Sequence, residues 1–124
     1  MDEFVLNATS KTPHIHLKEG SLIFEGKSIP EDPSLIYKPI LEWVKDYIET
    51  PPPQTTIDFR IEYCDTGSTK SIFEILKLLS NYVVTHHGGN MVFNWHFEKG
   101  DGEILELGEF LQSKLKIIFN FIEY

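Results

Sequence analysis

The segment from Thr56 to Lys70 constrains the fold of this chain more than any other. Up to Tyr63, apolar and polar residues alternate. This alternation predicts a β-strand with one face toward the core and the other toward water. The predicted core face comprises Ile57, Phe59, Ile61 and Tyr63. A polar turn follows, and then an amphipathic helix. The apolar stripe of this helix comprises Ile72, Ile75, Leu76, Leu79 and Val83.

The polar turn carries the best candidates for a functional site. Thr66, Ser68 and Thr69 place three hydroxyls between the strand and the helix. Hydroxyls at such a turn are expected to be exposed, close to helix N-terminal amides, and therefore suited to a reversible phosphate. The structural alternative is a helix N-cap, because Ser, Thr and Asp are the preferred residues there. Ser71 and Glu74 have capping-box spacing, so the helix should begin at Ser71 or a turn earlier.

The N-terminal half of the chain predicts a hairpin and a helix. His14–Leu17 and Leu22–Glu25 alternate on either side of a short turn, which indicates two antiparallel strands. Asp32-Pro33 is a typical helix start, and apolar residues then recur at helical spacing from Ile36 to Ile48. Pro39 lies inside this pattern, so the helix either bends there or has its firm part after it.

The C-terminal half predicts two more strands around a short helix. Gly88-Gly89 breaks the chain before an aromatic strand at Met91–Phe97. An acidic loop leads to a short helix over residues 104–111, and residues 117–122 form the last strand.

The order of these elements predicts an α/β fold with a mixed β-sheet of about five strands. The strand-helix-strand units call for parallel pairing in the middle of the sheet. Because the strands alternate, the helices should pack mainly on one face and leave the other in water. A chain of 124 residues has room for one domain, which we expect at residues 13–124 after a polar leader at residues 1–12.

The charge of the chain excludes several classes of partner. Nineteen acidic residues against eleven basic ones give a formal net charge of −8. Nucleic acid and anionic membrane surfaces are therefore not expected as partners. The single Cys64 excludes an internal disulfide and favours a reducing compartment. No run is long and apolar enough to insert into a bilayer, so the expected location is the cytoplasm.

Elsewhere in the sequence, no group of candidate catalytic or metal-binding residues is as well supported as the hydroxyl loop. His14 and His16 share a strand face, and His96 could lie on a neighbouring strand, so three imidazoles could bind zinc, but no Cys or carboxylate spacing supports such a site. A hydrolase centred on Asp65 or Cys64 would need a paired base, and none is identifiable. We therefore expect a binding module without a metal or cofactor, and not an enzyme.

Several short motifs recur in a fixed order along the chain. They are Thr12-Pro13, the run Gly26–Asp32, Pro39 with Trp43, the run Tyr63–Lys70, the strand residues Trp95–Glu98, and Glu106-Leu107-Gly108. Each is weak alone, but the ordered set resembles the SiaC family of bacterial regulatory phosphoproteins, and the resemblance covers nearly the whole chain.

The resemblance implies a fold like that of STAS domains, the anti-sigma-factor antagonists, and a phosphorylation switch. By this resemblance, a partner Ser/Thr protein kinase would phosphorylate the hydroxyl loop, and a metal-dependent protein phosphatase would remove the phosphate. The unphosphorylated form binds and activates a diguanylate cyclase, which links the family to cyclic-di-GMP and surface attachment. The family's acceptor threonine falls on Thr66, with Ser68 and Thr69 as alternates.

Two residues of the loop depart from the family pattern. The family usually has Asn before the threonine and Ser after it, whereas this chain has Asp65 and Gly67. Asp65 places a carboxylate beside the proposed phosphate, and Gly67 frees the backbone to take φ > 0. Lys70 lies within reach as a counter-ion. The expected partner-binding residues are Asp65, Thr66, Gly67, Ser68 and Lys70.

Two alternatives stay open at this point. A small-ligand sensor of STAS type would use the same loop to hold a nucleotide or a lipid headgroup. Separately, a homodimer could form through Ile23, Ile118 or Ile122, which we expect on the open sheet face.

Overall fold

The alternating segment forms the central strand β4 (Thr55–Cys64) in the computed structural model, which describes residues 1–86 and 90–124. Its apolar face is buried as predicted up to Ile61. The prediction was wrong for Tyr63, which is 50% exposed. The pairing with the neighbouring strand shifts by one residue here, so that Lys27 lies opposite Tyr63. Such a bulge reverses the alternation, because one strand gains an unpaired residue.

The sheet has six strands that follow one another in the order of the sequence. The other five are β1 (Phe4–Leu6), β2 (His14–Lys18), β3 (Ser21–Ser28), β5 (Met91–Phe97) and β6 (Phe119–Glu123). The pairs β1–β2 and β2–β3 are antiparallel, and β3, β4, β5 and β6 are parallel. The predicted hairpin and the parallel centre are confirmed. The count of about five strands missed β1, which lies within the predicted leader and is too short to show a period.

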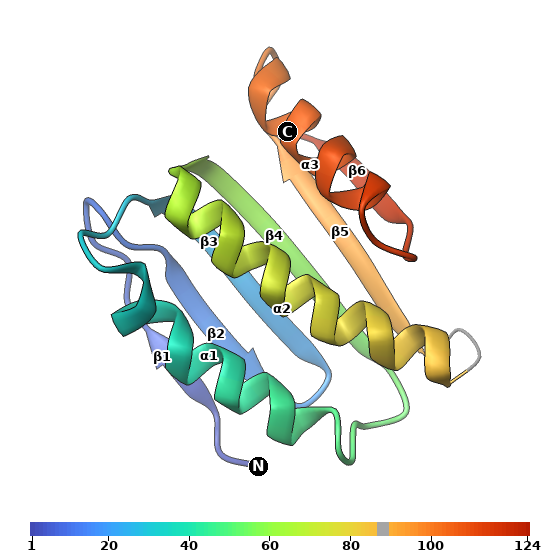
Figure 1. Cartoon of the computed structure of the whole chain (residues 1–124). Helices are drawn as coiled ribbons and strands as arrows, with labels where there is room; N and C mark the ends of the chain where they lie inside the picture. The colour runs from blue at the N-terminus through green and yellow to red at the C-terminus, as the bar shows by residue number, and fades with distance from the viewer. Residues whose placement is uncertain (87–89) are drawn as a thin grey trace.

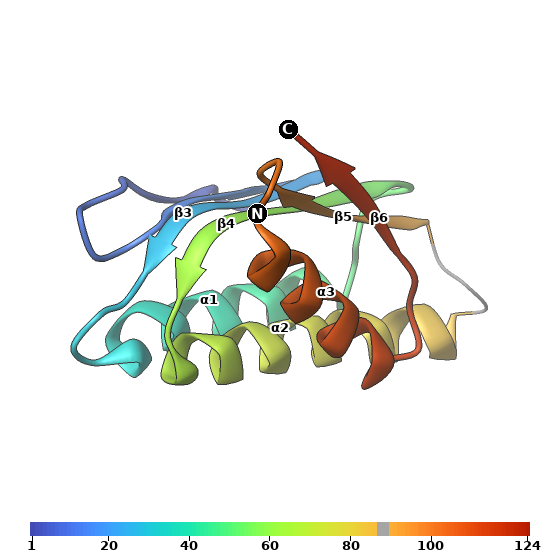
Figure 2. The same ribbon diagram turned by 90° about the horizontal axis from the view of Figure 1, so that it is seen from above.

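Three helices cover one face of the sheet, as predicted, and leave the other face open (Figure 2). They are α1 (Pro33–Tyr47), α2 (Thr66–Thr85) and α3 (Gly102–Ser113). Figure 1 shows α1 and α2 running side by side across the sheet, with α3 over β5 and β6. The mixed α/β fold expected from the sequence is therefore confirmed.

Helix α1 begins where the sequence predicts. Asp32 is the N-cap, and its carboxylate accepts the N–H of Ser34 at 3.1 Å. The helix continues through Pro39 without ending. Proline removes the hydrogen bond to the carbonyl four residues earlier, that of Leu35. Both of these residues lie on the exposed side of α1, so water can satisfy the freed carbonyl.

A row of aromatic rings crosses the parallel strands beneath the helices. Phe24 stacks on Phe59 with ring centroids 4.4 Å apart, and Phe59 lies 5.8 Å from Trp95. Trp95 then stacks on Phe119 at 5.6 Å. All four side chains are at most 5% exposed. Large aromatic surfaces contribute most per residue to burial, so this row anchors β3, β4, β5 and β6 to one core.

The C-terminal elements differ from the prediction only in detail. Strand β6 begins at Phe119, two residues after the predicted start, and Ile118 is 83% exposed outside it. The predicted break at Gly88-Gly89 lies outside the described residues. Of the other two residues named for a homodimer, Ile23 is half-buried and Ile122 is 38% exposed. The homodimer and the domain limits stay predictions.

Candidate functional site

The hydroxyl loop lies where β4 passes directly into α2. Asp65 has an extended backbone (φ −81°, ψ 179°) and is the N-cap of the helix. Its Oδ1 accepts the N–H of Ser68 at 2.8 Å. This bond satisfies one of the amides that a helix start leaves without a partner. The helix therefore begins at Thr66, more than a turn before Ser71.

The three hydroxyls of the loop have different environments. Thr66 is the first helical residue and is exposed, and its hydroxyl makes no hydrogen bond within residues 1–86 and 90–124. Ser68 is 0% exposed, so the expectation of an accessible hydroxyl was wrong for this residue. Thr69 is half-buried, and its Oγ1 donates to the carbonyl of Asp65 at 2.9 Å. Side chains two positions apart on a helix point to opposite sides, which separates Thr66 from Ser68. Thr69, three positions on, lies on the same side as Thr66 and differs from it by its burial and its bond to the backbone.

Ser68 belongs to a buried chain of hydroxyls. Ser28, at the end of β3, donates its Oγ proton to Ser68 Oγ at 2.7 Å. The same Ser28 oxygen lies 2.6 Å from the phenol oxygen of Tyr37 on α1. A serine has one hydroxyl proton, so Tyr37 is the donor of the second bond. Burial raises the pKa of Tyr37 to about 12, which keeps the phenol protonated as this role requires.

Gly67 lets the starts of α1 and α2 approach one another. It does not adopt a positive φ, so the expected backbone freedom is not used. A Cβ at this position would lie 2.9 Å from Cγ of Pro33. The glycine is therefore needed for close packing against the first residue of α1, and the two helix N-termini lie side by side.

The electrostatic surroundings of Thr66 are mixed. The N-terminal amides of α2 carry partial positive charge, and the carboxylate of Asp65 partly offsets it. Lys70 lies four residues along the helix from Thr66, on the same face, and is exposed. It forms no salt bridge within the part of the chain that the structure describes. Lys70 is thus available to a negative group on Thr66.

Cys64 stands beside the loop but lacks the features of a nucleophile. It is half-buried, and its Sγ lies 3.2 Å from Oγ1 of Thr69. Burial raises the pKa of the Cys64 thiol. Reactive cysteines have a lowered pKa, because the thiolate is the attacking form. The geometry therefore favours a structural thiol.

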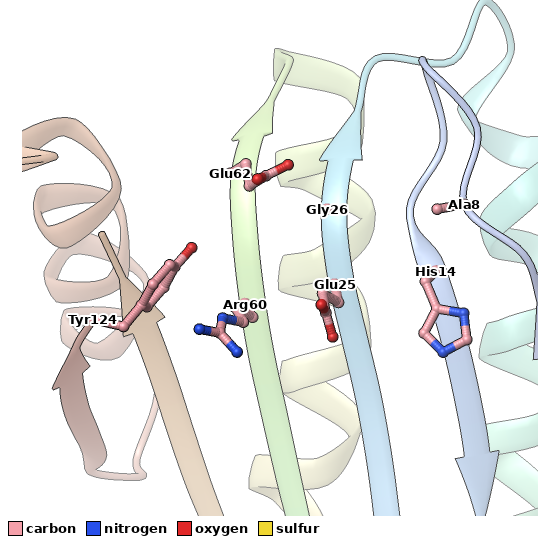
Figure 3. A pocket seen from close by; sticks show the side chains of 7 residues that line it. All are labelled: Ala8, His14, Glu25, Gly26, Arg60, Glu62 and Tyr124. Atoms are coloured by element: carbon pink, nitrogen blue, oxygen red, sulfur yellow. The ribbon is translucent and has the colours of Figure 1, made fainter. Parts of the chain in front are cut away.

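The open face of the sheet carries a polar hollow of about 510 Å³ (Figure 3). Its walls include His14, Glu25, Arg60, Glu62 and Tyr124. Glu25 lies opposite Arg60 in the parallel register, and the guanidinium of Arg60 sits over the ring of Tyr124, 3.9 Å from its centroid. Acidic and basic groups are interleaved here, so the hollow favours neither a cation nor an anion.

The three histidines named for zinc do not come together. His14 and His16 lie on β2, and His96 lies on β5, so β3 and β4 separate them. The expectation that His96 lies on a neighbouring strand was wrong. His96 Nε2 instead lies 2.8 Å from a carboxylate oxygen of Asp58 on β4. Within residues 1–86 and 90–124, no three His, Cys, Asp or Glu side chains are grouped so as to hold a metal ion.

A comparison with protein families matches the chain to SiaC family regulatory phosphoprotein over residues 6–124. The chain belongs to the SiaC family. An uncharacterised protein of Pseudomonas aeruginosa (strain UCBPP-PA14) is 29% identical in an alignment over 112 residues that covers 88% of this chain and 86% of that protein.

Solved structures of SiaC have the same fold. Apo-SiaC from Pseudomonas aeruginosa superposes with a TM-score of 0.87 at 24% identity, over 98% of this chain and 99% of the other. A second similar structure is the diguanylate cyclase SiaD in complex with its activator SiaC, also from Pseudomonas aeruginosa. It has a TM-score of 0.86 at 23% identity and covers 98% and 99% of the two chains. At this identity the likeness shows the fold.

Sequence reasoning missed part of the site in this SiaC family member. Ser28, Pro33 and Tyr37 shape the start of α2, yet no local pattern links them to the loop, because they lie far from it along the chain. No helix of the described residues has the length and hydropathy to cross a membrane.

Proposed function

We propose that this SiaC family protein is an activator of a diguanylate cyclase and that phosphorylation of Thr66 switches it off. One observation supports the choice of residue. Thr66 is exposed, whereas Ser68 is 0% exposed and Thr69 is bonded to the backbone. A kinase must align the attacking hydroxyl with the phosphoryl group, so an accessible hydroxyl at a helix start is the best substrate of the three.

The proposed partners follow from the family. SiaC of Pseudomonas aeruginosa is the activator in a complex with the cyclase SiaD, and we transfer that class of partner to this chain. The family resemblance implies a Ser/Thr protein kinase and a metal-dependent phosphatase as the two regulators. All would meet in the cytoplasm, which the free Cys64 favours.

The switch would act through charge at the first turn of α2. A phosphate on Thr66 adds about −1.5 to −2 charge at neutral pH. The helix amides and Lys70 would stabilise it by roughly 0.3–1 kcal/mol, while Asp65 would repel it. A partner docked over this turn would bury the new charge without a matching donor. Burying an unpaired charge costs several kcal/mol, which is enough to release the partner.

The surface beside the switch suits protein docking. A groove of about 600 Å³ runs along α1, with Phe4, Leu35, Pro39 and Trp43 among its apolar lining. Leu35 lies in the first turn of α1 and is 74% exposed. Because the starts of α1 and α2 lie side by side, a partner that covers Leu35 would also reach Thr66. Exposed apolar side chains grouped in this way are typical of interaction sites.

Calorimetry against a cognate diguanylate cyclase tests the proposal. Thr66→Ala should bind with the affinity of the wild type, and Thr66→Glu should bind at least about tenfold more weakly. Thr50→Glu adds the same charge at an exposed site in the loop after α1 and serves as the control. Equal affinities for the Ala and Glu variants of Thr66 would contradict the switch.

Phosphosite mapping of the protein from its native host tests the residue directly. Phosphate on Thr66 would support the assignment, and phosphate on Ser68 or Thr69 would move it. If no phosphate is found under several growth conditions, the small-ligand sensor becomes the better reading, and ligand-dependent melting would test it.

A further inference from the structure

A second hollow lies at the other end of α2, well away from Thr66. Its walls come from the middle and the C-terminal part of α2, from Phe73 to Val84, and from the segment that follows α3, residues 114–116. Figure 2 shows the end of α3 reaching the level of α2, next to its last turns. The hollow has a volume of about 300 Å³. Lys77 is eleven residues after Thr66, which corresponds to about 16 Å along a helix.

Three lysines line this hollow, and no acidic residue does. They are Lys77 on α2 and Lys114 and Lys116 after α3. The chain has only eleven basic residues and a net charge of −8, so this grouping is unusual for its composition. None of the three forms a salt bridge with any residue in the described ranges 1–86 and 90–124. Nζ of Lys114 lies 5.5 Å from the ring centroid of Phe110, a contact that leaves its positive charge in place. The charge of the three lysines is therefore not neutralised and can attract an anion.

A structural role explains only one of these lysines. Lys114 is the C-cap of α3, where a cation favours the partial negative charge of the last carbonyls. Lys77 lies in the middle of α2, and Lys116 lies beyond the helix end, so neither serves this purpose. Both nevertheless line the same hollow as Lys114.

The walls of the hollow are held in place by hydrogen bonds. Ser80 is 3% exposed, and its Oγ accepts the N–H of Lys116 at 3.2 Å. A few residues further on, Oε1 of Gln112 accepts the N–H of Phe119 at 2.7 Å. The segment that carries two of the lysines is thus fixed to α2 at one end and to α3 at the other. A site that is formed before the ligand arrives loses less entropy on binding.

The hollow also offers apolar surface. Phe73, Val84 and Leu115 line it together with the lysines. A volume of about 300 Å³ is at the lower end of the range for small-molecule sites. The combination suits a ligand with one strongly anionic group and a compact, less polar body.

We propose that this lysine pocket, defined by Lys77, Lys114 and Lys116, binds a small phosphorylated metabolite of about mononucleotide size. The phosphate would lie among the three ammonium groups, and the body would contact Phe73 and Leu115. The site does not overlap the loop around Thr66, so this proposal stands independently of the phosphorylation switch.

Isothermal titration calorimetry with AMP, adenosine and inorganic phosphate tests the proposal on the full chain. AMP should bind saturably below about 1 mM, and adenosine, which lacks the phosphate, should bind at least about tenfold more weakly. Lys77→Gln and Lys116→Gln should each weaken AMP binding about fivefold or more, because charge-assisted bonds to phosphate are lost.

Lys99→Gln removes one charge at an exposed position outside the pocket and is the matched control. It should change the affinity for AMP less than about twofold. Three results would each overturn the assignment: no saturable binding of AMP or phosphate, equal affinity for AMP and adenosine, or an equal loss in the Lys99 variant. All three variants change exposed side chains, so each should melt close to the wild type.

Discussion

The hydroxyl of Ser28 donates a 2.7 Å hydrogen bond to the hydroxyl of Ser68, forty residues further along the chain. Both side chains are 0% exposed. The bond turns Ser68 inward at the first turn of α2. Because a helix rotates about 100° per residue, Thr66 then points outward. The buried hydrogen bond therefore determines which hydroxyl of the loop is accessible to solvent.

Loss of this bond should lower stability without removing the proposed acceptor. Ser68→Ala leaves the Ser28 proton without its buried partner, so the free energy of unfolding should fall by about 1–2 kcal/mol. Urea unfolding measures the change, with Thr66→Ala as the exposed control that should stay within about 0.5 kcal/mol of the wild type. The same loss in both variants would contradict the buried network.

The next member of the network predicts a pH dependence. Burial raises the pKa of Tyr37 to about 12, whereas an unfolded tyrosine titrates near pH 10. Between these two values the unfolded chain releases the phenol proton and the folded chain retains it. Stability from this group is therefore complete below pH 10 and is lost as the pH rises toward 12, by about 2–3 kcal/mol.

Tyr37→Phe isolates this effect. The variant should be less stable than the wild type at pH 8 by about 1–2 kcal/mol, because Ser28 loses its donor. Above pH 10 the difference in stability between the wild type and the variant should narrow, because the wild type loses stability from its phenol and the variant has no phenol at this position. Urea unfolding at several pH values gives both results. As the control, Tyr63→Phe removes the hydroxyl of a ring that is 50% exposed, and at pH 8 its stability should stay within about 0.5 kcal/mol of the wild type.

These buried contacts mark the limit of what the sequence could predict. Local periodicity was enough for β4 and α2, because each follows from the spacing of apolar residues. The parallel centre of the sheet follows from the order of strands and helices. It failed at Tyr63, where a bulge reverses the alternation, and at Ser68, where a partner on β3 sets the orientation. Both failures are due to contacts with β3, one a shift in strand pairing and the other a side-chain hydrogen bond. Neither contact can be predicted from the residues of β4 or α2 alone.

Two substitutions of Asp65 separate its role as the N-cap of α2 from the effect of its negative charge. Asp65→Ala removes the acceptor for the N–H of Ser68 and should cost about 1 kcal/mol. Asp65→Asn retains a good cap and should be nearly neutral. The double variant Asp65→Asn/Thr66→Glu should be more stable than Thr66→Glu alone, because the single variant places two negative charges next to each other. Equal stability of the Asn and Ala variants in thermal melts would argue against the cap.

The contact between Gly67 and Pro33 can be measured by a double-mutant cycle. A Cβ at residue 67 would lie 2.9 Å from Cγ of the proline ring. Alanine within a helix normally stabilises it by about 1 kcal/mol relative to glycine. We expect that gain only when Pro33→Ala removes the ring, which gives a coupling of about 1 kcal/mol between the two sites. Additive effects in urea unfolding would show that the helix starts do not touch.

A second glycine holds α3 against the sheet. A Cβ at Gly108 would lie 2.5 Å from Cδ1 and Nε1 of Trp95, a fully buried ring whose Nε1 donates to the carbonyl of Ile104 at 2.8 Å. The ring cannot move aside without losing that bond and its stacking on Phe119. Gly108→Ala should therefore destabilise the protein by at least about 2 kcal/mol, despite the better helix propensity of alanine.

Gly102→Ala provides the matched control, because its Cβ would meet no atom within 4 Å at the start of the same helix. We expect a change within about 0.5 kcal/mol for this variant. Urea unfolding followed by tryptophan fluorescence, with both glycine variants made in a Trp43→Phe background, reports the stability and the environment of Trp95, which is then the single tryptophan. If the two variants unfolded at the same urea concentration, the close packing of α3 on Trp95 would be wrong. A loss confined to Gly108→Ala would explain physically why the Trp95 and Gly108 motifs occur together in this chain.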